Sequence, residues 1–417
     1  MQLLDRLKKK IRQYDPRVWY LFIARVFNAT GFGIVLPFLS IYLYQEMGVP
    51  MSIVGAIFLF AAVTRAVFQY IGGHLTDRYG RRAILLVGSS GRAVMFFMLA
   101  AVVYFGANFW WIALGVVGSY GFGAMFFPAA DAMVADVAPS EDRVEVYAIQ
   151  RIGVNLGWAI GPALGGILSQ LPFYLLFVMT GFFFVFTFFF VLTFVRESHR
   201  GGTGQALNFR QLLSFGGAGA FLWFCIFVLI VFSVMNQFVS TLSVYSVQFM
   251  NVSKMQVGFL FTINGLLIVL FQFPITRLIR RMRLTSALAL GAAMNGLAYL
   301  LIPALRTGFW TVAGTIALVT RGEMFVTPSG AALVSRWAPE EEKGRYFGIF
   351  GLFMSFGRSV GPFYGGVLLD LLQDNAFALW GIISGLAFAA AAGFKSVARF
   401  IPAKANVQVV EETSGTH

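Results

Sequence analysis

Residues 128–166 read PAADAMVADVAPSEDRVEVYAIQRIGVNLGWAIGPALGG, and residues 328–366 read PSGAALVSRWAPEEEKGRYFGIFGLFMSFGRSVGPFYGG. The two stretches align without a gap at a constant offset of 200 residues. So regular a match is not expected by chance, and it predicts two homologous halves that fold as similar bundles and face each other. The coinciding residues are Pro128 with Pro328, Pro139 with Pro339, Gly157 with Gly357, Gly161-Pro162 with Gly361-Pro362, and Gly165-Gly166 with Gly365-Gly366.

The whole chain is too apolar for a water-soluble protein. Of its 417 residues, 58% are hydrophobic and 12% are charged, whereas a soluble domain carries about 25% charged residues. A folded chain must still expose a surface, and a surface this apolar is stable only when a lipid bilayer is the solvent. We predict an all-α integral membrane protein, since transmembrane strands would be about ten residues long and alternate in polarity.

Twelve long apolar runs are candidate transmembrane helices. A run of about 20 apolar residues is long enough to cross the hydrocarbon core. The predicted spans are 18–44, 53–74, 83–105, 109–134, 146–169, 172–195, 217–246, 255–276, 284–304, 309–335, 346–369 and 376–398.

The longest polar connection, residues 196–216, separates two groups of six spans. It predicts an N-terminal bundle over residues 18–195 and a C-terminal bundle over residues 217–398. We expect residues 1–17 to form a basic cytoplasmic tail and residues 399–417 to form a polar cytoplasmic tail.

The distribution of Lys and Arg orients these spans. The net charge of +13 would suggest nucleic-acid binding in a soluble protein. Here the positive residues gather before the first span and in alternate connections, as they do in cytoplasmic loops, because positive charge resists translocation. We therefore expect both termini in the cytoplasm, a multi-pass protein of the cell inner (plasma) membrane, and no nucleic-acid partner.

Residues 73–82, between the second and third spans, read GHLTDRYGRR. This stretch resembles the signature loop of the major facilitator superfamily, Gly-x-Leu-x-Asp-Arg-x-Gly-Arg-Arg, in both pattern and position. The resemblance extends over essentially the whole chain, from the number of spans to the central loop and the repeat. It implies the major facilitator fold, in which two pseudo-symmetric six-helix bundles alternate access to a midplane cavity.

The resemblance also implies a conformational gate at the cytoplasmic boundary. In the family, the matching acid and arginine belong to a charge cluster that locks the outward-facing state, which gives this role to Asp77 and Arg81, with Asp136 as the partner of Arg81. Gly73 and Gly80 are expected to allow close backbone approach and a tight turn. The alternative is that the charges only set the topology. The predicted gate comprises Gly73, Asp77, Arg78, Gly80, Arg81, Arg82, Asp136 and Arg143.

Glycines recur at intervals of four residues in the fifth span and again in the eleventh. Small residues at this spacing let helices pack closely, and proline bends a helix. The pattern resembles the motif of the twelve-helix drug/proton antiporter branch, which favours export, whereas helix packing explains it equally well. The residues are Gly153, Gly157, Gly161, Pro162, Gly165, Gly166, Gly357, Gly361, Pro362, Gly365 and Gly366.

Several ionisable residues lie inside predicted spans, where each costs on the order of 3 kcal/mol unless it faces a cavity or a partner. A carboxylate in a partly dry cavity can bind and release a proton. We expect Glu323 to be the first candidate proton carrier and Asp131 the second, with a structural ion pair as the alternative for each. The resemblance implies that spans one, four, seven and ten line the cavity, so its further candidates are Arg25, Asn28, Asn236, Gln237 and Arg321.

Two features depart from the drug antiporters. Where many of them carry an arginine in span four, this chain has Val117, and span one lacks the carboxylate that attracts cations. A net-positive cavity would instead favour anionic or zwitterionic solutes.

We therefore expect a secondary active transporter, namely a monomeric, proton-coupled exporter of small amphiphilic solutes, with solute, protons and membrane lipid as its partners. The alternatives are a proton-coupled or passive transporter of one metabolite and a non-transporting membrane sensor. The sequence has no Gly-x-x-x-x-Gly-Lys phosphate loop, His-Glu-x-x-His motif or paired-cysteine metal ligands. We expect no enzyme, no metal and no cofactor, with the proton gradient as the energy source.

Overall fold

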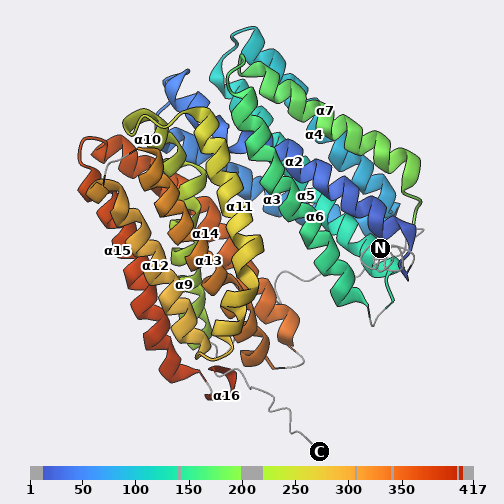
Figure 1. Ribbon diagram of the computed structural model, residues 1–417. Helices are drawn as coiled ribbons and strands as arrows, with labels where there is room; N and C mark the ends of the chain where they lie inside the picture. Colours follow the sequence, from blue (N-terminus) through green and yellow to red (C-terminus); the bar gives the residue numbers. More distant parts are fainter. Residues whose placement is uncertain are drawn as a thin grey trace, which may run out of the picture. The chain divides into compact units, whose positions relative to one another are not determined.

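The computed structural model describes residues 13–139, 142–198, 219–305, 308–339, 342–401 and 403–406. This part of the chain is nearly all helical (Figure 1). The start of the predicted basic tail, residues 199–216 of the predicted linker and the tail from residue 407 lie outside the described residues.

The first six predicted spans are confirmed as helices, each within a few residues of its predicted bounds. They are α2 (Pro16–Gln45), α3 (Met51–Tyr79), α4 (Arg81–Tyr104), α5 (Phe109–Val137), α6 (Arg143–Leu168) and α7 (Tyr174–Phe194).

The second half gives the corresponding set, ending in two short elements. Its helices are α9 (Gly219–Met235), the 3-10 turn η1 (Asn236–Val239), α10 (Thr241–Phe249), α11 (Lys254–Ile279), α12 (Leu284–Leu305), α13 (Phe309–Trp337), α14 (Lys343–Leu372), α15 (Ala376–Val397), η3 (Ala398–Phe400) and α16 (Ala403–Asn406).

Polar side chains mark where several helices begin. Asp15 accepts a hydrogen bond from the backbone N–H of Arg17 (2.8 Å), and Asn375 accepts one from that of Ala378 (3.0 Å). These side chains satisfy N–H groups that have no partner in the first turn of a helix. α2 also begins with Pro16, which needs no such partner.

The span predicted over residues 217–246 is not one continuous helix. It breaks at η1, between α9 and α10. The hydroxyl of Ser243 donates to the Phe238 carbonyl (2.9 Å) and so satisfies one of the groups that the break frees. A broken helix is tolerated inside a membrane when side chains satisfy its backbone in this way.

The described chain is a multi-pass membrane protein. Nine of its described helices, with α9 to α10 counted as one, are long and apolar enough to cross a membrane. α6, α13 and α14 are also long enough to cross a membrane, at 26, 29 and 30 residues, but they are less apolar. α13 carries Arg321 and Glu323 within its length, and α14 carries Arg358 and Asp370.

The chain divides into two compact units. The division follows the two halves of the sequence, except that the start of α3 belongs with the second unit and the start of α11 with the first. The bundle boundaries at residues 195 and 217 stay predictions. The first unit holds the described residues of 1–48, 57–207 and 253–265, and the second those of 49–56, 208–252 and 266–417.

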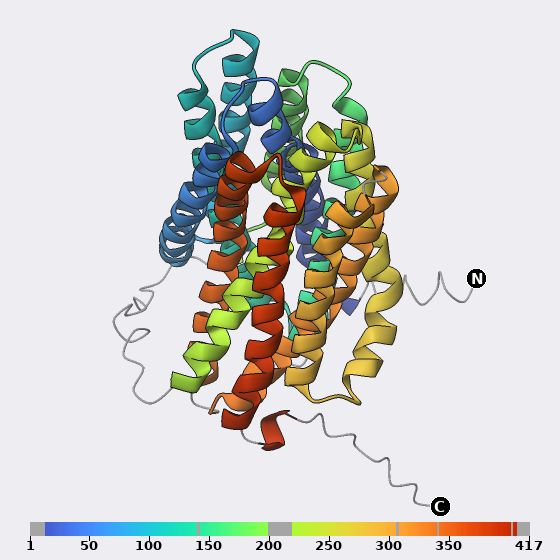
Figure 2. The ribbon, with the colours of Figure 1, turned by 90° about the vertical axis from the view of Figure 1, so that its left-hand side faces the viewer.

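Corresponding helices pack in the same pattern inside each unit. In the first unit α2 packs against α6 and α7, and α4 packs against α5 and α7. In the second, α9 packs against α14 and α15, and α12 packs against α13 and α15; α15 is the red helix beside α12 in Figures 1 and 2. The repeat in the sequence is therefore also a repeat in helix packing.

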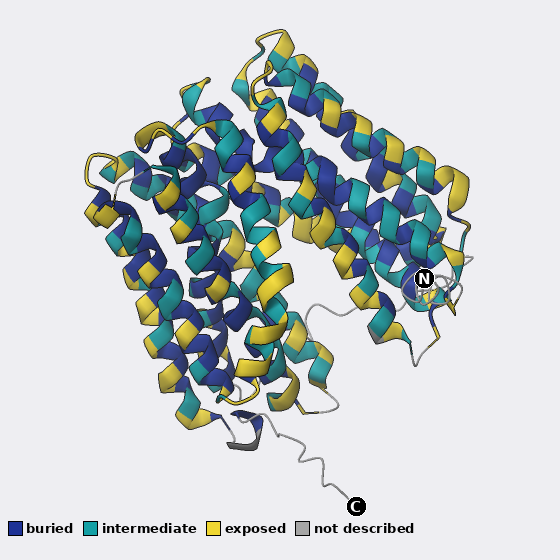
Figure 3. Ribbon diagram, in the orientation of Figure 1, coloured by how far each residue is buried: buried dark blue, intermediate teal, exposed yellow. Residues whose placement is uncertain are grey.

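Residues are mostly buried on the helix faces that meet other helices and more exposed on the outer faces (Figure 3). In the second unit, the buried rings of Tyr299 and Trp380 stack with their centroids 5.4 Å apart. Large apolar side chains such as Phe60, 68% exposed, and Val269, 75% exposed, remain on the surface. Such a surface is the one expected for helices that face lipid.

Candidate functional site

Arg81 is the centre of a charge cluster where α3 meets α4. Its Nη1 donates to Asp77 Oδ1 (2.8 Å) and to the Thr76 carbonyl (2.9 Å), and its Nε donates to Asp136 Oδ2 on α5 (3.1 Å). The Arg81 side chain is only 10% exposed. Its planar guanidinium thus ties three helices together through fixed donor positions. The structure brings together the acid, the arginine and the partner named from the sequence, while their gating role stays a prediction.

Two further residues of this cluster, Glu197 and Ser198, were not predicted. Glu197 accepts the backbone N–H groups of Arg81 (2.9 Å) and Arg82 (3.0 Å), so its carboxylate caps the first turn of α4. Ser198 Oγ donates to Asp136 Oδ2 (2.7 Å). A negative charge at a helix N-terminus is favourable. The only signal in the sequence was an acid shortly after the sixth span.

The two glycines of the predicted gate behave differently. Gly80 has φ of +94°, a backbone conformation that favours glycine, and it immediately precedes α4. The predicted close approach at Gly73 was wrong, because a Cβ there would meet no described atom within 4 Å. The close approach belongs to the preceding Gly72, where a Cβ would lie 2.9 Å from Met125 Cα on α5.

The other three predicted gate residues contact rings and backbone carbonyls. The guanidinium of Arg78 lies 5.3 Å from the ring centroid of Tyr79. Arg82 Nη2 donates to a carbonyl of α7 (2.6 Å), and Arg143 Nη2 donates to a carbonyl of α5 (3.0 Å). Arg82 and Arg143 therefore connect helix ends, Arg78 contacts only the ring of its neighbour among these groups, and Arg81 is the arginine that binds Asp77 and Asp136.

A second ion pair lies inside the spans of the first unit. Arg25 Nη2 on α2 donates to Asp131 Oδ1 on α5 at 2.5 Å. The Arg25 side chain is 6% exposed, whereas the Asp131 side chain is 49% exposed. The hydroxyl of Tyr147 on α6 donates to the backbone carbonyl of Asp131 (3.0 Å). Asp131, a predicted proton carrier, thus has a buried cationic partner, while about half of its own side chain is exposed.

Asn28, one turn after Arg25, does not line an accessible cavity. It is 1% exposed, and its Oδ1 accepts a hydrogen bond from Nη1 of Arg92 on α4 (2.8 Å), which is 4% exposed. The Arg92 guanidinium lies 4.7 Å from the Phe32 ring centroid and 4.3 Å from that of Phe184. Aromatic faces and an amide oxygen therefore stabilise a cation in the core of the first unit.

The two amides of η1 bind the backbone of α14. Gln237 is fully buried, and its Nε2 donates to the Gly361 carbonyl (2.8 Å). Asn236 Nδ2 donates to the Arg358 carbonyl (2.5 Å). In this structure Gln237 is enclosed against α14, and its predicted cavity role stays a prediction.

The remaining candidates lie on α13 of the second unit. Arg321 is exposed and Glu323 is partly buried. Residues two apart on a helix point to different faces. Between them, Gly322 packs on α12, where a Cβ would lie 2.6 Å from the Gly291 carbonyl oxygen. Glu323, which is partly buried, stays a candidate proton carrier.

The glycine motif places α6 in backbone contact with α2. A Cβ at Gly161 would lie 2.5 Å from the Thr30 carbonyl oxygen and 2.9 Å from Gly33 Cα, closer than Cβ atoms normally approach. Pro162 lies inside the same helix. The glycines facing α2 are Gly153, Gly157, Gly161 and Gly165, whereas Gly166 faces the start of α11.

The motif repeats on α14, which packs against α9 and η1. Here a Cβ at Gly361 would collide with the Ser233 carbonyl. Pro362 again follows inside the helix. The contacts of the other glycines are Gly357 with the Leu229 carbonyl, Gly365 with the Gln237 side chain, and Gly366 with Met51 at the start of α3.

Among the residues that the structure describes, no group of three or more His, Cys, Asp and Glu side chains is placed to hold a metal ion.

Comparison with known proteins gives a consistent family match. The sequence profile of the Major Facilitator Superfamily matches residues 21–322 and 247–410. The uncharacterized MFS-type transporter YqjV of Bacillus subtilis (strain 168) is 26% identical over 391 residues, which cover 91% of this chain and 92% of that protein.

Two further relatives carry more specific names. The Na(+), Li(+), K(+)/H(+) antiporter of Planococcus maritimus is 24% identical, with 85% of this chain and 89% of that protein covered. The quinolone resistance protein NorA of Staphylococcus aureus (strain Mu50 / ATCC 700699) is 25% identical, with 82% and 87% covered.

Solved structures agree on the fold. A POT family transporter in complex with 5-aminolevulinic acid superposes with a TM-score of 0.75 at 16% identity, covering 92% of this chain and 96% of that one. At this identity the likeness shows the fold alone.

Proposed function

We propose that this chain, which belongs to the Major Facilitator Superfamily, exports small amphiphilic solutes across the inner membrane in exchange for protons. Its family and fold are those of transporters of small-molecule solutes. The names of two relatives, a cation/proton antiporter and a quinolone resistance protein, support proton exchange and drug export in this chain.

The ion pair between Arg25 and Asp131 is the observation that supports proton coupling most directly. Asp131 is half exposed and can take up a proton from water, whereas Arg25 is enclosed. Protonation of Asp131 would leave the Arg25 charge buried without its counter-ion, which is strongly unfavourable. A conformation that rehydrates Arg25, or a solute group that replaces the carboxylate, would then be favoured.

The Arg81 cluster supports a conformational cycle in this proposal. Arg81 holds Asp77 of α3 and Asp136 of α5 in one arrangement of the first unit. A state that separates α3 from α5 at this end would break these ion pairs. We infer that the cluster stabilises one of the two access states, with both chain termini in the cytoplasm.

Reconstituted transport tests the proposal. The purified protein is placed in liposomes that contain a pH-sensitive dye, and amphiphilic drugs, anionic metabolites and zwitterionic metabolites are added in turn. In the wild type, an amphiphilic drug should drive proton movement. Asp131→Asn should lower that movement at least about tenfold, the effect of losing about 1.4 kcal/mol of coupling. Glu323→Gln tests the second carboxylate in the same assay.

Two variants distinguish a loss of proton coupling from a loss of folding stability. Asp374→Asn changes an exposed carboxylate after α14 and should transport like the wild type. Arg25→Gln combined with Asp131→Asn removes the buried charge as well, so it should recover the thermal stability that Asp131→Asn loses and still move no protons.

Other outcomes would contradict the proposal in distinct ways. Solute movement without protons would make the protein a facilitator. A response to one anionic or zwitterionic metabolite alone would make it a transporter of that metabolite. If no solute moved in active preparations, a sensor would be the better interpretation.

A further inference from the structure

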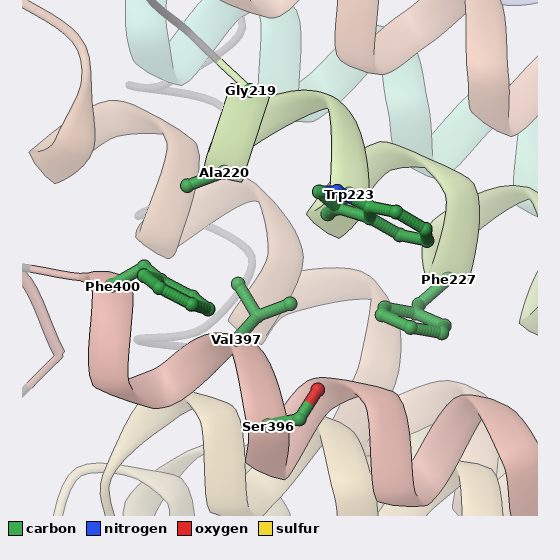
Figure 4. Close-up of a pocket in the computed structure, with 7 residues that line it drawn as sticks. All are labelled: Gly219, Ala220, Trp223, Phe227, Ser396, Val397 and Phe400. Carbon is green, nitrogen blue, oxygen red and sulfur yellow. The ribbon is translucent and has the colours of Figure 1, made fainter.

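The second unit contains an apolar pocket of about 510 Å³ where α9 begins and α15 ends. Trp223 and Phe227 of α9 face Val397 and Phe400 across it (Figure 4). Phe227 is anchored from behind, with its ring centroid 6.1 Å from that of Phe394. Trp223 and Phe400 are 59% and 64% exposed, so the mouth of the pocket is aromatic, and no other described residue closes it.

The walls of this pocket are mostly carbon, and its polar side-chain groups are the indole N–H of Trp223 and the hydroxyl of Ser396. Its one hydroxyl, on Ser396, donates to the Gly393 carbonyl of its own helix (2.8 Å). The first residues of α9 are small, and a Cβ at Gly219 would meet no described atom within 4 Å. An apolar chain therefore fits this space, whereas a polar solute would lose its hydration and gain few partners.

Two cations neighbour pocket-lining residues in the chain: Lys395 at the end of α15 precedes Ser396, and Arg399 in η3 precedes Phe400. Both cations are exposed, four residues apart at the end of the same candidate membrane span. Arg399 Nε donates to the Ser396 carbonyl (3.1 Å). This bond ties the guanidinium to the backbone of a residue that lines the pocket.

The pocket lies at the ends of two candidate membrane spans, Gly219–Phe249 and Ala376–Phe400. Aromatic residues and snorkelling cations at span ends sit at the level of lipid headgroups. The distribution of Lys and Arg places this end of the spans on the cytoplasmic side, where anionic lipids attract basic side chains.

We propose that this pocket binds one anionic phospholipid. An acyl chain lies against Trp223, Phe227 and Phe400, and the phosphate binds Arg399 and Lys395. The proposal does not depend on the transported solute or on proton coupling. The charge of the rim selects an anionic headgroup over a zwitterionic one, and the apolar walls select a lipid over a free phosphate.

Lipid competition on the full-length protein tests this site. Native mass spectrometry measures retention of phosphatidylglycerol and of phosphatidylcholine by detergent-purified protein. In the wild type, phosphatidylglycerol should be retained preferentially. Lys395→Gln with Arg399→Gln should lower that preference by about 30-fold, since each basic residue near an anionic lipid contributes about a factor of five to six.

Matched variants locate the effect. Arg277→Gln with Arg280→Gln removes the same charge from exposed residues at the end of α11, and should leave the preference within about twofold because distant charges are screened. Ala220→Phe fills the pocket and should lower retention of phosphatidylglycerol while both cations remain. Free glycerol phosphate should not compete.

An equal loss of the preference for phosphatidylglycerol in the two double arginine or lysine variants would overturn the proposal, because it would indicate diffuse electrostatic attraction between the protein and anionic lipid. Unchanged lipid retention in Ala220→Phe would overturn it as well, because the acyl chain would then lie elsewhere. Retention of a soluble amphiphilic drug in place of lipid would assign the pocket to the solute. Thermal stability of each variant shows whether it is folded.

Discussion

At the scale of single residues, the guanidinium of Arg81 has the most specific geometry of the described charges. Its donors reach two carboxylates and one carbonyl on α3 and α5. A lysine ammonium carries the same charge but cannot hold these acceptors in a plane. Charge and geometry can therefore be separated by one substitution.

Arg81→Lys should lower the initial rate of solute transport at least about tenfold, because a hydrogen bond to a charged group is worth about 1.5–3 kcal/mol. The measurement is uptake into everted vesicles at matched protein abundance. Arg277→Lys, at an exposed arginine outside the predicted gate, should stay within about twofold of the wild type. Equal rates in both variants would mean that only the charge at position 81 matters.

Asp15, just before α2, gives a pH-dependent contribution to stability. A side-chain hydrogen bond from Arg17 holds the pKa of Asp15 below its ordinary value. A lowered pKa in the folded state stabilises the protein above the pKa of the unfolded chain, about 3.9, and this contribution is lost as the pH falls through the folded-state pKa.

Asp15→Ala should destabilise the protein by about 0.5–2 kcal/mol at pH 7, the usual effect of losing an N-cap. The difference from the wild type should shrink as the pH falls below about 4. Thermal unfolding in detergent across this pH range measures it. Asp142→Ala is the control, since Asp142 makes no side-chain capping bond to α6; an equal loss there would show that the effect is not specific to the cap.

At the scale of elements, backbone contact between helices sets the packing inside each unit. Gly161 of α6 lies against α2, and Gly361 of α14 lies against α9, at corresponding positions. A methyl group at either place would overlap a carbonyl group. The two helix pairs should therefore respond alike to the same substitution.

Gly161→Ala and Gly361→Ala should each destabilise the protein by about 1–3 kcal/mol, the usual cost of overpacking. Gly73→Ala and Gly381→Ala are matched helical controls, because a Cβ at either position meets no described atom within 4 Å. Detergent thermal-shift assays compare the four variants. Similar losses at packed and open glycines would contradict the close-contact explanation, because helix propensity alone favours alanine over glycine and predicts no loss at the open positions.

The start of α3 is capped by a residue from α14 inside the second unit. Asp370 Oδ1 accepts the backbone N–H of Met51 (2.9 Å), and Oδ2 accepts that of Ser52 (2.8 Å). A carboxylate in this position satisfies orphan donors and complements the helix dipole. The first turn of α3 thus depends on a side chain that is distant in sequence.

Asp370→Ala should increase hydrogen exchange at residues 51–54 by about 3- to 30-fold, which corresponds to about 0.5–2 kcal/mol of local capping energy. Exchange in the rest of α3 should change little. Asp374→Ala removes a carboxylate from the same helix end and should leave the exchange at residues 51–54 unchanged. No change in Asp370→Ala would show that water replaces the cap at no cost.

The spans could be predicted from the sequence because the length of an apolar run is a local property. The break at η1 was missed because an apolar run does not reveal where a helix changes pitch; its only sign was the adjacent pair Asn236 and Gln237. Asn28 was misplaced for a related reason. On a helix that is apolar on every side, composition does not show which face meets the bundle core.

The partners within the candidate site were predictable only in part. The pairing of Arg81 with Asp136 followed from the family resemblance. Glu197 and Asp370 were missed because their hydrogen-bond partners lie up to 116 and 319 residues away in the chain. A lone carboxylate in a loop or helix end does not indicate which distant helix it caps.

At the scale of the whole molecule, the predicted topology decides on which side of the membrane each charged connection lies. With an even number of spans, both termini lie on one side, and the basic connections must share that side. In the predicted twelve-span topology, we expect the connection after α11, which includes Arg283, to be cytoplasmic and the connection after α14, which includes Asp374, to be external. The native Cys225 is fully buried and is the chain's single cysteine, so introduced cysteines report on their own positions.

In intact cells, a membrane-impermeant maleimide should label Asp374→Cys and leave Arg283→Cys unlabelled, because the bilayer separates the reagent from cytoplasmic loops. Both positions are exposed, so permeabilised cells should give equal labelling of the two. The wild type should remain unlabelled in either case. Reversed labelling would place the Arg81 cluster and the basic rim of the α9–α15 pocket on the external side. The gate and the lipid site would then both have to be reassigned to the opposite leaflet, since the predicted twelve-span topology puts them on the same side of the membrane as Arg283.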